Sequence, residues 1–238
     1  MVSEADVRRN PPALWAWPDR ARFGRVVPKA KFYEHAAVGS RTRERFVAQV
    51  AHITWAFKLG PTTVGLAGSE GVPEIEVLEV ALKPEAEDVS DEVLAAINRA
   101  IPAPLLIEVR STGVSSQAPA RQSAMRVRLT AALTKQRTAE LVTTAWLPAT
   151  TERIPLPAAL DLPGLHAALL APLMPHAVHP GESIAQSAER SAAIRRLERE
   201  VAALRRRVRN EKQFNRRAEA NRLLRERIAS LADLTGTT

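Results

Sequence analysis

The last quarter of the chain restricts the fold more than any other part. No residue between Ser183 and about Leu234 breaks a helix. Ser183, with Gln186 three residues later, has the pattern of a capping box, which marks the start of a helix. About fifty helical residues at ~1.5 Å each make a rod of roughly 75 Å. We therefore predict one long C-terminal helix within residues 182–238.

Apolar residues in this segment follow the alternating three- and four-residue spacing of a coiled-coil seam. The first run is Ile194, Leu197, Val201, Leu204 and Val208, and the second is Asn221, Leu224, Ile228 and Leu231. The two runs are out of phase by one residue, and such a slip distorts a supercoil or marks a bend. We predict a coiled coil that joins a second copy or another helical protein. The alternative is a helix that packs back on its own domain.

The join between the two runs is polar except for one aromatic residue. Phe214 stands among amide and cationic side chains, where a filler segment would continue the seam with aliphatic residues. An aromatic residue in such surroundings resembles an interface anchor. We predict a docking or register site made of Lys212, Gln213, Phe214 and Asn215. The alternative is that Phe214 caps the core of the preceding domain.

The net charge of +8 is concentrated in the tail. Residues 181–238 carry 14 Lys and Arg against 8 Asp and Glu, whereas the remaining residues carry 20 against 18. Arginine pairs well with phosphate, so two arginine-rich surfaces are candidates for nucleic-acid binding. One is Arg126 and Arg128 on a strand face, and the other is Arg205, Arg206, Arg207, Arg209, Arg216 and Arg217 in the tail.

The residues before the tail alternate between helical and strand patterns. Helices are predicted at 29–35, after Ser40 through Phe57, and after Ser90; strands are predicted at 74–83, 105–109, 125–129 and 141–147, with a loop at 113–121. The fold class is therefore α+β, with a mostly antiparallel sheet of about four strands and helices on one face, followed by the long C-terminal helix.

Proline and charge set the expected domain boundaries. Residues 1–27 are predicted to form an irregular N-terminal arm, and residues 28–148 the α+β domain. Residues 149–181 hold six prolines and are predicted to be a connector with one short helix at 165–173. Residues 182–238 form the coiled-coil helix.

Composition excludes several classes of function. The chain has no cysteine, which excludes disulfides, iron–sulfur clusters and thiolate zinc sites. Residues 1–12 lack the apolar core of a signal peptide, and no apolar run approaches the roughly 20 residues of a membrane span. We expect a cytoplasmic protein with no membrane partner.

Sequence motifs for catalysis are missing as well. There is no phosphate-binding loop and no nucleophile elbow, and His176 and His179 have no nearby carboxylates to complete a metal site. Acidic residues at Glu74, Glu76, Glu79 and Glu108, with Lys83, could in principle hold Mg²⁺ for a nuclease, but surface charge explains them as well. We predict no catalytic residue, no metal and no cofactor, and keep a nuclease as an alternative.

Several segments together resemble a known family. They are VPKAKFYEH, ITWAFKL, PEIEVLEVALK, TTAWLP and, in the tail, NEKQFNRRAEAN. In combination they resemble bacterial proteins of the domain-of-unknown-function family four-three-nine-one, from about Trp17 to the C-terminus. The strand SAMRVRLTAAL departs from the bulky aromatic strands that are usual there.

The resemblance implies a system rather than a mechanism. Genes of this family often lie beside helicases and DNA methyltransferases of restriction-like, anti-phage systems, and the family has no established activity. We expect a non-enzymatic accessory or scaffold subunit of such a defence system. Its partner would be a second copy or a helicase- or methyltransferase-type protein, reached through the coiled coil. The alternative is a DNA-binding or nuclease accessory that uses the arginine-rich surfaces.

Overall fold

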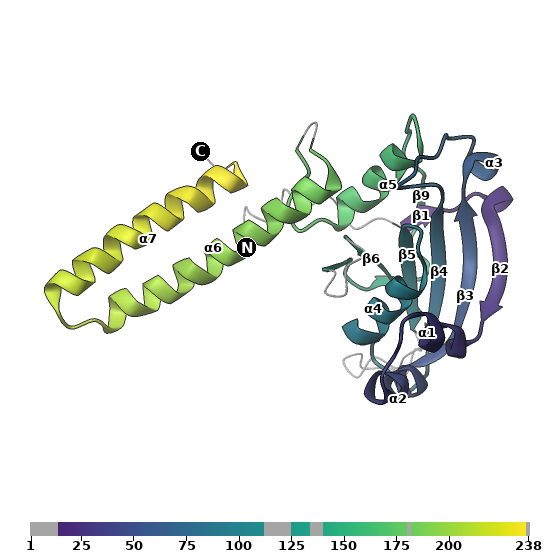
Figure 1. Ribbon diagram of the computed structural model, residues 1–238, viewed down its shortest axis with the longest axis horizontal. Helices are drawn as coiled ribbons and strands as arrows, with labels where there is room; N and C mark the ends of the chain where they lie inside the picture. Colours follow the sequence, from purple (N-terminus) through teal and green to yellow (C-terminus); the bar gives the residue numbers. More distant parts are fainter. Residues whose placement is uncertain (1–13, 112–124, 134–139, 180–181, 237–238) are drawn as a thin grey trace. The chain divides into compact units, whose positions relative to one another are not determined.

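The computed structural model describes residues 14–111, 125–133, 140–179 and 182–236, and it divides into two units (Figure 1). The first unit runs from Met1 to Met174 and the second from Pro175 to Thr238. The proline-rich stretch expected to be a connector therefore belongs mostly to the first unit. The predicted loop at 113–121 lies outside the described residues.

The first unit is built on a seven-stranded mixed sheet. The strands lie in the order β2 (Arg22–Val27), β3 (Val50–Leu59), β4 (Ile75–Leu82), β5 (Leu105–Ser111), β6 (Arg126–Ala132) and β7 (Leu141–Thr143), and β8 (Leu147–Pro148) also pairs with β6. All neighbours are antiparallel except β4 and β5, which are parallel. Helix α4 (Asp91–Ala100) connects these two strands, as a parallel pair requires.

The predicted sheet of about four mostly antiparallel strands is too small. Two strands were assigned wrongly: β2 lies in the segment expected to be an irregular arm, and β3 was predicted to be helical. Val50 and Ile53 are three residues apart yet both enter the helix-covered core, because a β-bulge shifts the register between Val50 and His52. The bulge gives a strand the spacing of a helix.

Three helices cover one face of this sheet. They are α1 (Lys29–His35), α2 (Ser40–Gln49) and α4, which were predicted in position although α2 ends earlier than expected. Their buried side chains Phe32, Phe46 and Leu94 pack on alternate residues of β4 and β5, such as Leu78 and Ile107. Each strand therefore presents its other side chains to the opposite face.

The opposite face is crossed by chain segments from both ends of the first unit. Strand β1 (Leu14–Ala16) pairs in parallel with β9 (Arg153–Pro155). The remaining helical elements of the first unit are η2 (Asp19–Ala21), α3 (Pro61–Val64), α5 (Leu162–Leu170) and η3 (Ala171–Leu173). Trp17 packs against Phe57 of β3, with ring centroids 6.1 Å apart. The N-terminal segment from residue 14 is thus ordered by strand pairing and aromatic contact.

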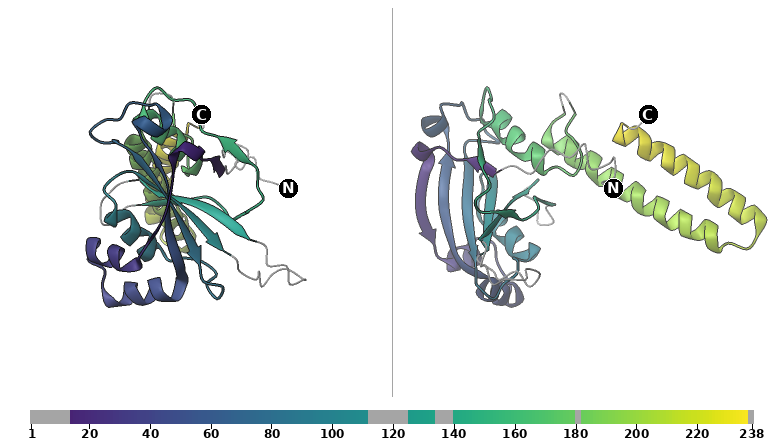
Figure 2. Two further views of the ribbon diagram at one scale, coloured as in Figure 1. Left: turned by 90° about the vertical axis from the view of Figure 1, so that its right-hand side faces the viewer. Right: turned by 180° about the vertical axis from the view of Figure 1, so that it is seen from behind.

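The second unit is a helical hairpin. Helix α6 (Ile184–Asn210) and helix α7 (Phe214–Thr235) lie side by side and run in opposite directions (Figure 2). The predicted capping box of Ser183 and Gln186 is confirmed. The predicted unbroken helix is wrong, because residues 211–213 leave the helical conformation. The turn lies where the two apolar runs slip out of phase. Of the two effects expected from this slip, a distorted supercoil or a bend, the structure has the bend.

Candidate nucleic-acid interface

The hairpin closes by packing the apolar stripes of its two helices against each other. Val201 of α6 and Ala220 of α7 are buried, and the small alanine lets the helices approach closely. Glu200 Oε2 accepts a hydrogen bond of 2.8 Å from Arg227 Nε, which joins the two helices at mid-length. The stripes therefore meet within one chain.

The predicted seam residues differ in how far this packing buries them. Ile194 and Val201 are buried, Leu197, Leu204, Val208, Leu224 and Leu231 are half-buried, and Asn221 and Ile228 are exposed. A second copy is not needed to cover the buried members. Self-association through this seam stays a prediction. Its main support is Ile228, an apolar seam residue that remains exposed.

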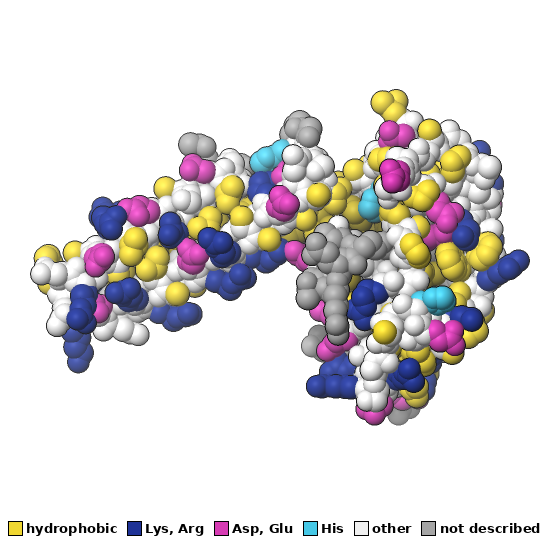
Figure 3. Space-filling view, viewed as in Figure 1, with side chains coloured by type: hydrophobic (Ala, Val, Ile, Leu, Met, Phe, Trp, Pro, Cys, Tyr) yellow, Lys and Arg dark blue, Asp and Glu magenta, His cyan; other side chains and the backbone are white. Residues whose placement is uncertain are grey.

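The net charge of the second unit is gathered around the hairpin turn. Residues 205–217, called the cationic turn below, hold seven Lys and Arg and one acidic residue, Glu211. Residues 181–238 outside it carry seven of each sign, so the entire excess of the tail lies in the cationic turn. Figure 3 shows Lys and Arg side chains along the hairpin and at its turn. All six tail arginines predicted to bind nucleic acid are in this segment.

The seven cations of the cationic turn are exposed and, among the described residues, have no ion-pair partner. They are Arg205, Arg206, Arg207, Arg209, Lys212, Arg216 and Arg217. Arginines nearer the middle of the hairpin differ. Arg196 pairs with Glu200 at 3.2 Å and Arg222 pairs with Glu226 at 2.6 Å. The cationic turn is therefore the part of the hairpin with positive charge available to an anionic ligand.

Phe214 lies at the first position of α7, inside the cationic turn, with 73% of its surface exposed. Its neighbours Lys212, Gln213 and Asn215 are exposed too, and no side chain caps the start of α7. The hairpin itself does not cover Phe214, and the alternative that Phe214 caps the core of the preceding domain stays a prediction. A bulky aromatic residue in solvent does not stabilise the hairpin, so it is available for contact with another molecule.

The second predicted arginine surface is largely occupied within the first unit. The guanidinium groups of Arg126 and Arg128 lie 5.1 and 5.2 Å from the centre of the Trp146 ring. Arg128 also pairs with Asp88 at 2.7 Å, and only 12% of its side chain is exposed. Burial lowers the pKa of Arg128, against the opposing effect of Asp88. These arginines form an internal cation–π and ion-pair cluster rather than an open phosphate-binding face.

The carboxylates considered for a nuclease are split between the two faces of the sheet. Glu76 shares its side of β4 with Leu78, toward the helices, whereas Glu79 lies beside Glu108 of β5 on the opposite side. Among the described residues, no group of three or more His, Cys, Asp or Glu could hold a metal ion. Alternation along β4 therefore keeps Glu76 apart from Glu79 and Glu108.

Glu108 is fully buried and held by three donors that the sequence did not predict. Arg153 donates to both of its oxygens at 2.7 and 2.8 Å, and Trp17 Nε1 donates to Oε1 at 2.6 Å. Arg110 adds a longer contact of 3.3 Å. Burial by itself raises the pKa of Glu108, but the bonds from Arg153 and Trp17 outweigh it and hold this pKa below its ordinary value.

Glu76 is also buried but keeps a raised pKa. Trp55 Nε1 donates to Oε2, and Lys58 Nζ lies 3.1 Å from Oε1. Burial is the main cause that raises the pKa of Glu76 to about 7, and a hydrogen bond with Glu74 adds to it. Lys58 in turn lies over the Trp55 ring, 4.4 Å from its centre. The Glu76 carboxyl therefore takes up a proton near neutral pH, and its hydrogen-bonding atoms are already engaged by Trp55, Lys58 and Glu74.

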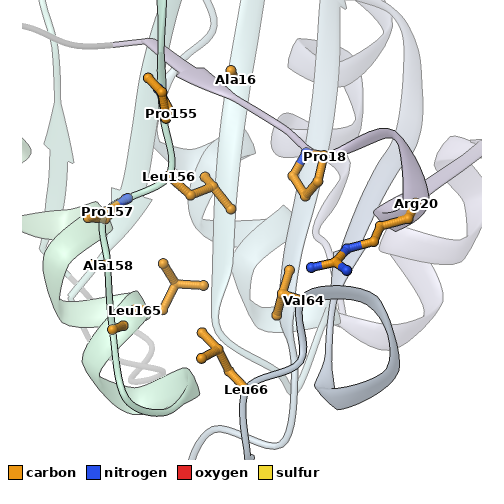
Figure 4. A pocket seen from close by; sticks show the side chains of 11 residues that line it. Ala16, Pro18, Arg20, Val64, Leu66, Pro155, Leu156, Pro157, Ala158 and Leu165 are labelled. Atoms are coloured by element: carbon orange, nitrogen blue, oxygen red, sulfur yellow. The ribbon is translucent and has the colours of Figure 1, made fainter.

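An open pocket of about 450 Å³ lies at the edge of the first unit (Figure 4). Its walls come from the N-terminal segment at Pro18, the end of α3 at Val64 with the following Leu66, and residues 155–159. Arg20 is the one charged residue among those that line it. The pocket was not predicted, because its walls come together from segments that are distant in sequence.

The fold and the site define an α+β protein that carries a cationic helical hairpin. Residues 16–231 match the model of the family described as Domain of unknown function (DUF4391), and the chain belongs to this family. The resemblance seen in the sequence is thereby confirmed at the level of the family. Neither a search of curated proteins nor a search of solved structures finds a match. Among the described residues, no helix has both the length and the apolar character needed to cross a membrane.

Proposed function

We propose that the protein is a non-enzymatic accessory subunit that binds nucleic acid through the cationic turn of its C-terminal hairpin. The observation that supports this proposal is the concentration of seven exposed cations in thirteen residues, none of which has an ion-pair partner in the described part of the chain. Phosphate contacts of this kind supply most of the affinity of sequence-independent nucleic-acid binding. The seven cations come from the C-terminal end of α6, from the residues between the helices and from the first turn of α7.

A scaffold role in a defence system is the second part of the proposal. Its support is the exposed Ile228, which leaves the hairpin with an apolar side chain for a protein partner. A helicase- or methyltransferase-type partner that itself holds DNA would bring the cationic turn close to phosphates. Co-purification from native lysate, followed by mass spectrometry, identifies such a partner. Recovery of the protein without any nucleic-acid enzyme counts against this part.

Direct binding is tested by fluorescence anisotropy of a labelled oligonucleotide with the full chain. The decisive variant changes Arg205, Arg206, Arg207 and Arg209 to Gln. Its matched control changes Arg196, Arg199, Arg222 and Arg225 to Gln, which removes the same charge from the middle of the hairpin. We expect the first variant to bind at least about tenfold more weakly and with a shallower salt dependence, because each phosphate contact adds about 0.7–0.9 to the log–log slope.

The control variant should keep most of the affinity, because two of its four arginines are already paired with Glu200 and Glu226. Equal losses in both variants would mean that net charge alone attracts the oligonucleotide. Absence of binding by the unmodified chain at low salt would reject the proposal.

A further inference from the structure

The cationic turn combines two features that serve different parts of a nucleic acid. Arg207 and Arg209 belong to the last turn of α6, and Arg216 and Arg217 to the first turn of α7. Phe214 lies between these pairs in the sequence and is 73% exposed. Cations contact phosphates, but they do not explain why a bulky aromatic side chain is held in water among them.

The structure gives Phe214 no role inside the hairpin. Among the described aromatic rings, none lies against it, and the packing that joins the helices is made elsewhere, by residues such as Val201 and Ala220. A polar residue would start α7 equally well and would avoid exposed apolar surface. The aromatic ring therefore indicates a ligand with a flat apolar face.

Unpaired bases provide such a face, and base pairs in a duplex do not. In a duplex the faces of the bases are stacked inside, so a ring that approaches the backbone stays in water. In a single strand the bases can turn out and stack on an aromatic side chain while nearby cations hold the phosphates. An anionic membrane surface fits less well, because Phe214 is the only exposed large apolar residue of the cationic turn and interfacial binding needs a wider apolar face.

We propose that the cationic turn binds single-stranded nucleic acid, with Phe214 stacking on an unpaired base and the surrounding arginines contacting the phosphates. This inference rests on the proposed nucleic-acid binding and adds the substrate class. It also makes Phe214 a determinant of the preference between single strand and duplex. The charge of the turn sets affinity for both forms, and the ring sets the difference between them.

The test compares the affinity of the full chain for a short mixed-sequence single strand and for the same strand annealed to its complement. We expect the single strand to bind more tightly. Phe214→Ala should weaken single-strand binding by about 5- to 150-fold, the range measured for loss of one stacking contact, and leave duplex binding unchanged. Phe214→Tyr should keep the preference, whereas Phe214→Leu, which keeps apolar character without a flat ring, should lose it.

Leu160 provides a matched control, because it is 97% exposed in the first unit and its change to Ala should not affect either affinity. Equal affinity for both forms, or no effect of Phe214→Ala, would overturn this inference and leave nucleic-acid binding intact. Absence of binding to both forms would overturn both proposals. Binding to phosphatidylserine vesicles with no binding to either nucleic-acid form would also overturn both.

Discussion

Arg227 of α7 donates a 2.8 Å hydrogen bond to Glu200 of α6, across 27 residues of sequence. In an unbroken helix these two residues would lie about 40 Å apart at ~1.5 Å per residue. Both side chains are partly exposed, so the ion pair itself contributes little to stability. Its value is as a marker of register, because it shows that the chain reverses direction at residues 211–213 within one molecule.

The first prediction concerns this reversal. The chain has no cysteine, so spin labels can be placed at Arg199→Cys and Ala229→Cys without other changes. Both positions are exposed and lie on either side of the Glu200–Arg227 pair. We expect a short distance by pulsed electron paramagnetic resonance, and a distance near 45 Å, that of ~30 helical residues, would indicate one continuous rod.

The second prediction concerns the close contact that holds the hairpin together. Ala220 is 1% exposed, so Ala220→Glu places a charge between the helices and should separate them, since burying an unpaired charge costs several kcal/mol. Hydrogen exchange of α7 should become much faster, while exchange in the first unit stays the same. Ala218→Glu is the matched control at an exposed position and should leave exchange unchanged. Fast exchange in both variants would argue that α7 is not held by this contact.

The third prediction concerns the pair formed by the buried Glu108 and the half-buried Arg153. Glu108→Gln should destabilise the first unit by about 3–5 kcal/mol, because the guanidinium loses its buried anionic partner. Chemical denaturation measures the loss. The double change Glu108→Leu and Arg153→Met removes both charges and should cost less than the single change. If the single and double variants lose the same amount, the two residues do not act as a pair.

The fourth prediction uses the raised pKa of Glu76. In the folded state this group holds a proton up to about pH 7, whereas in the unfolded chain it loses the proton near 4.5. Between these values the folded state binds more protons, so stability falls as pH rises. Glu76→Gln should remove this part of the dependence, a difference on the order of 3 kcal/mol between pH 4.5 and 7.

Denaturation curves of the unmodified chain and the Glu76→Gln variant at several pH values test this difference. Glu108 has the opposite sign, because its lowered pKa gives stability above pH 4.5 that is lost on acidification below it. The Glu76→Gln variant should therefore still lose stability in acid. Parallel curves for the two proteins between pH 4.5 and 7 would show that Glu76 is ionised throughout that range.

Elements with strong local signals were predictable from the sequence. Strand β4, helix α4 and strand β5 follow directly from their apolar patterns, and the start of α6 follows from Ser183. Strand β3 was missed because its bulge imitates helical spacing. The turn at 211–213 was missed because it contains no glycine or proline, and only the slip between the apolar runs marked it.

The residues of the candidate site were predictable from the sequence, but their position at the turn of a helical hairpin was not. The tail arginines and Phe214 were identified from composition and spacing, yet only the hairpin shows that their charge is confined to one turn. The sequence did not reveal that Trp146 contacts Arg126 and Arg128, or that Asp88 pairs with Arg128, because these are tertiary contacts. The partners of Glu108 lie 91 and 45 residues away, a distance at which sequence carries no local signal.

The long reach of the Glu108 contacts has a consequence for how the chain folds during synthesis. Glu108 leaves the ribosome 45 residues before Arg153, and an unpaired carboxylate is strongly disfavoured in the centre of a sheet. Until β9 has been made, Glu108 has only Trp17 and the longer contact of Arg110, so we expect strand β5 to settle fully only once Arg153 is present. The contacts between α6 and α7 lie within residues 175–238, so we expect the hairpin to form as these residues emerge. We expect nascent chains that stop short of Arg153 to remain open and to be sensitive to protease.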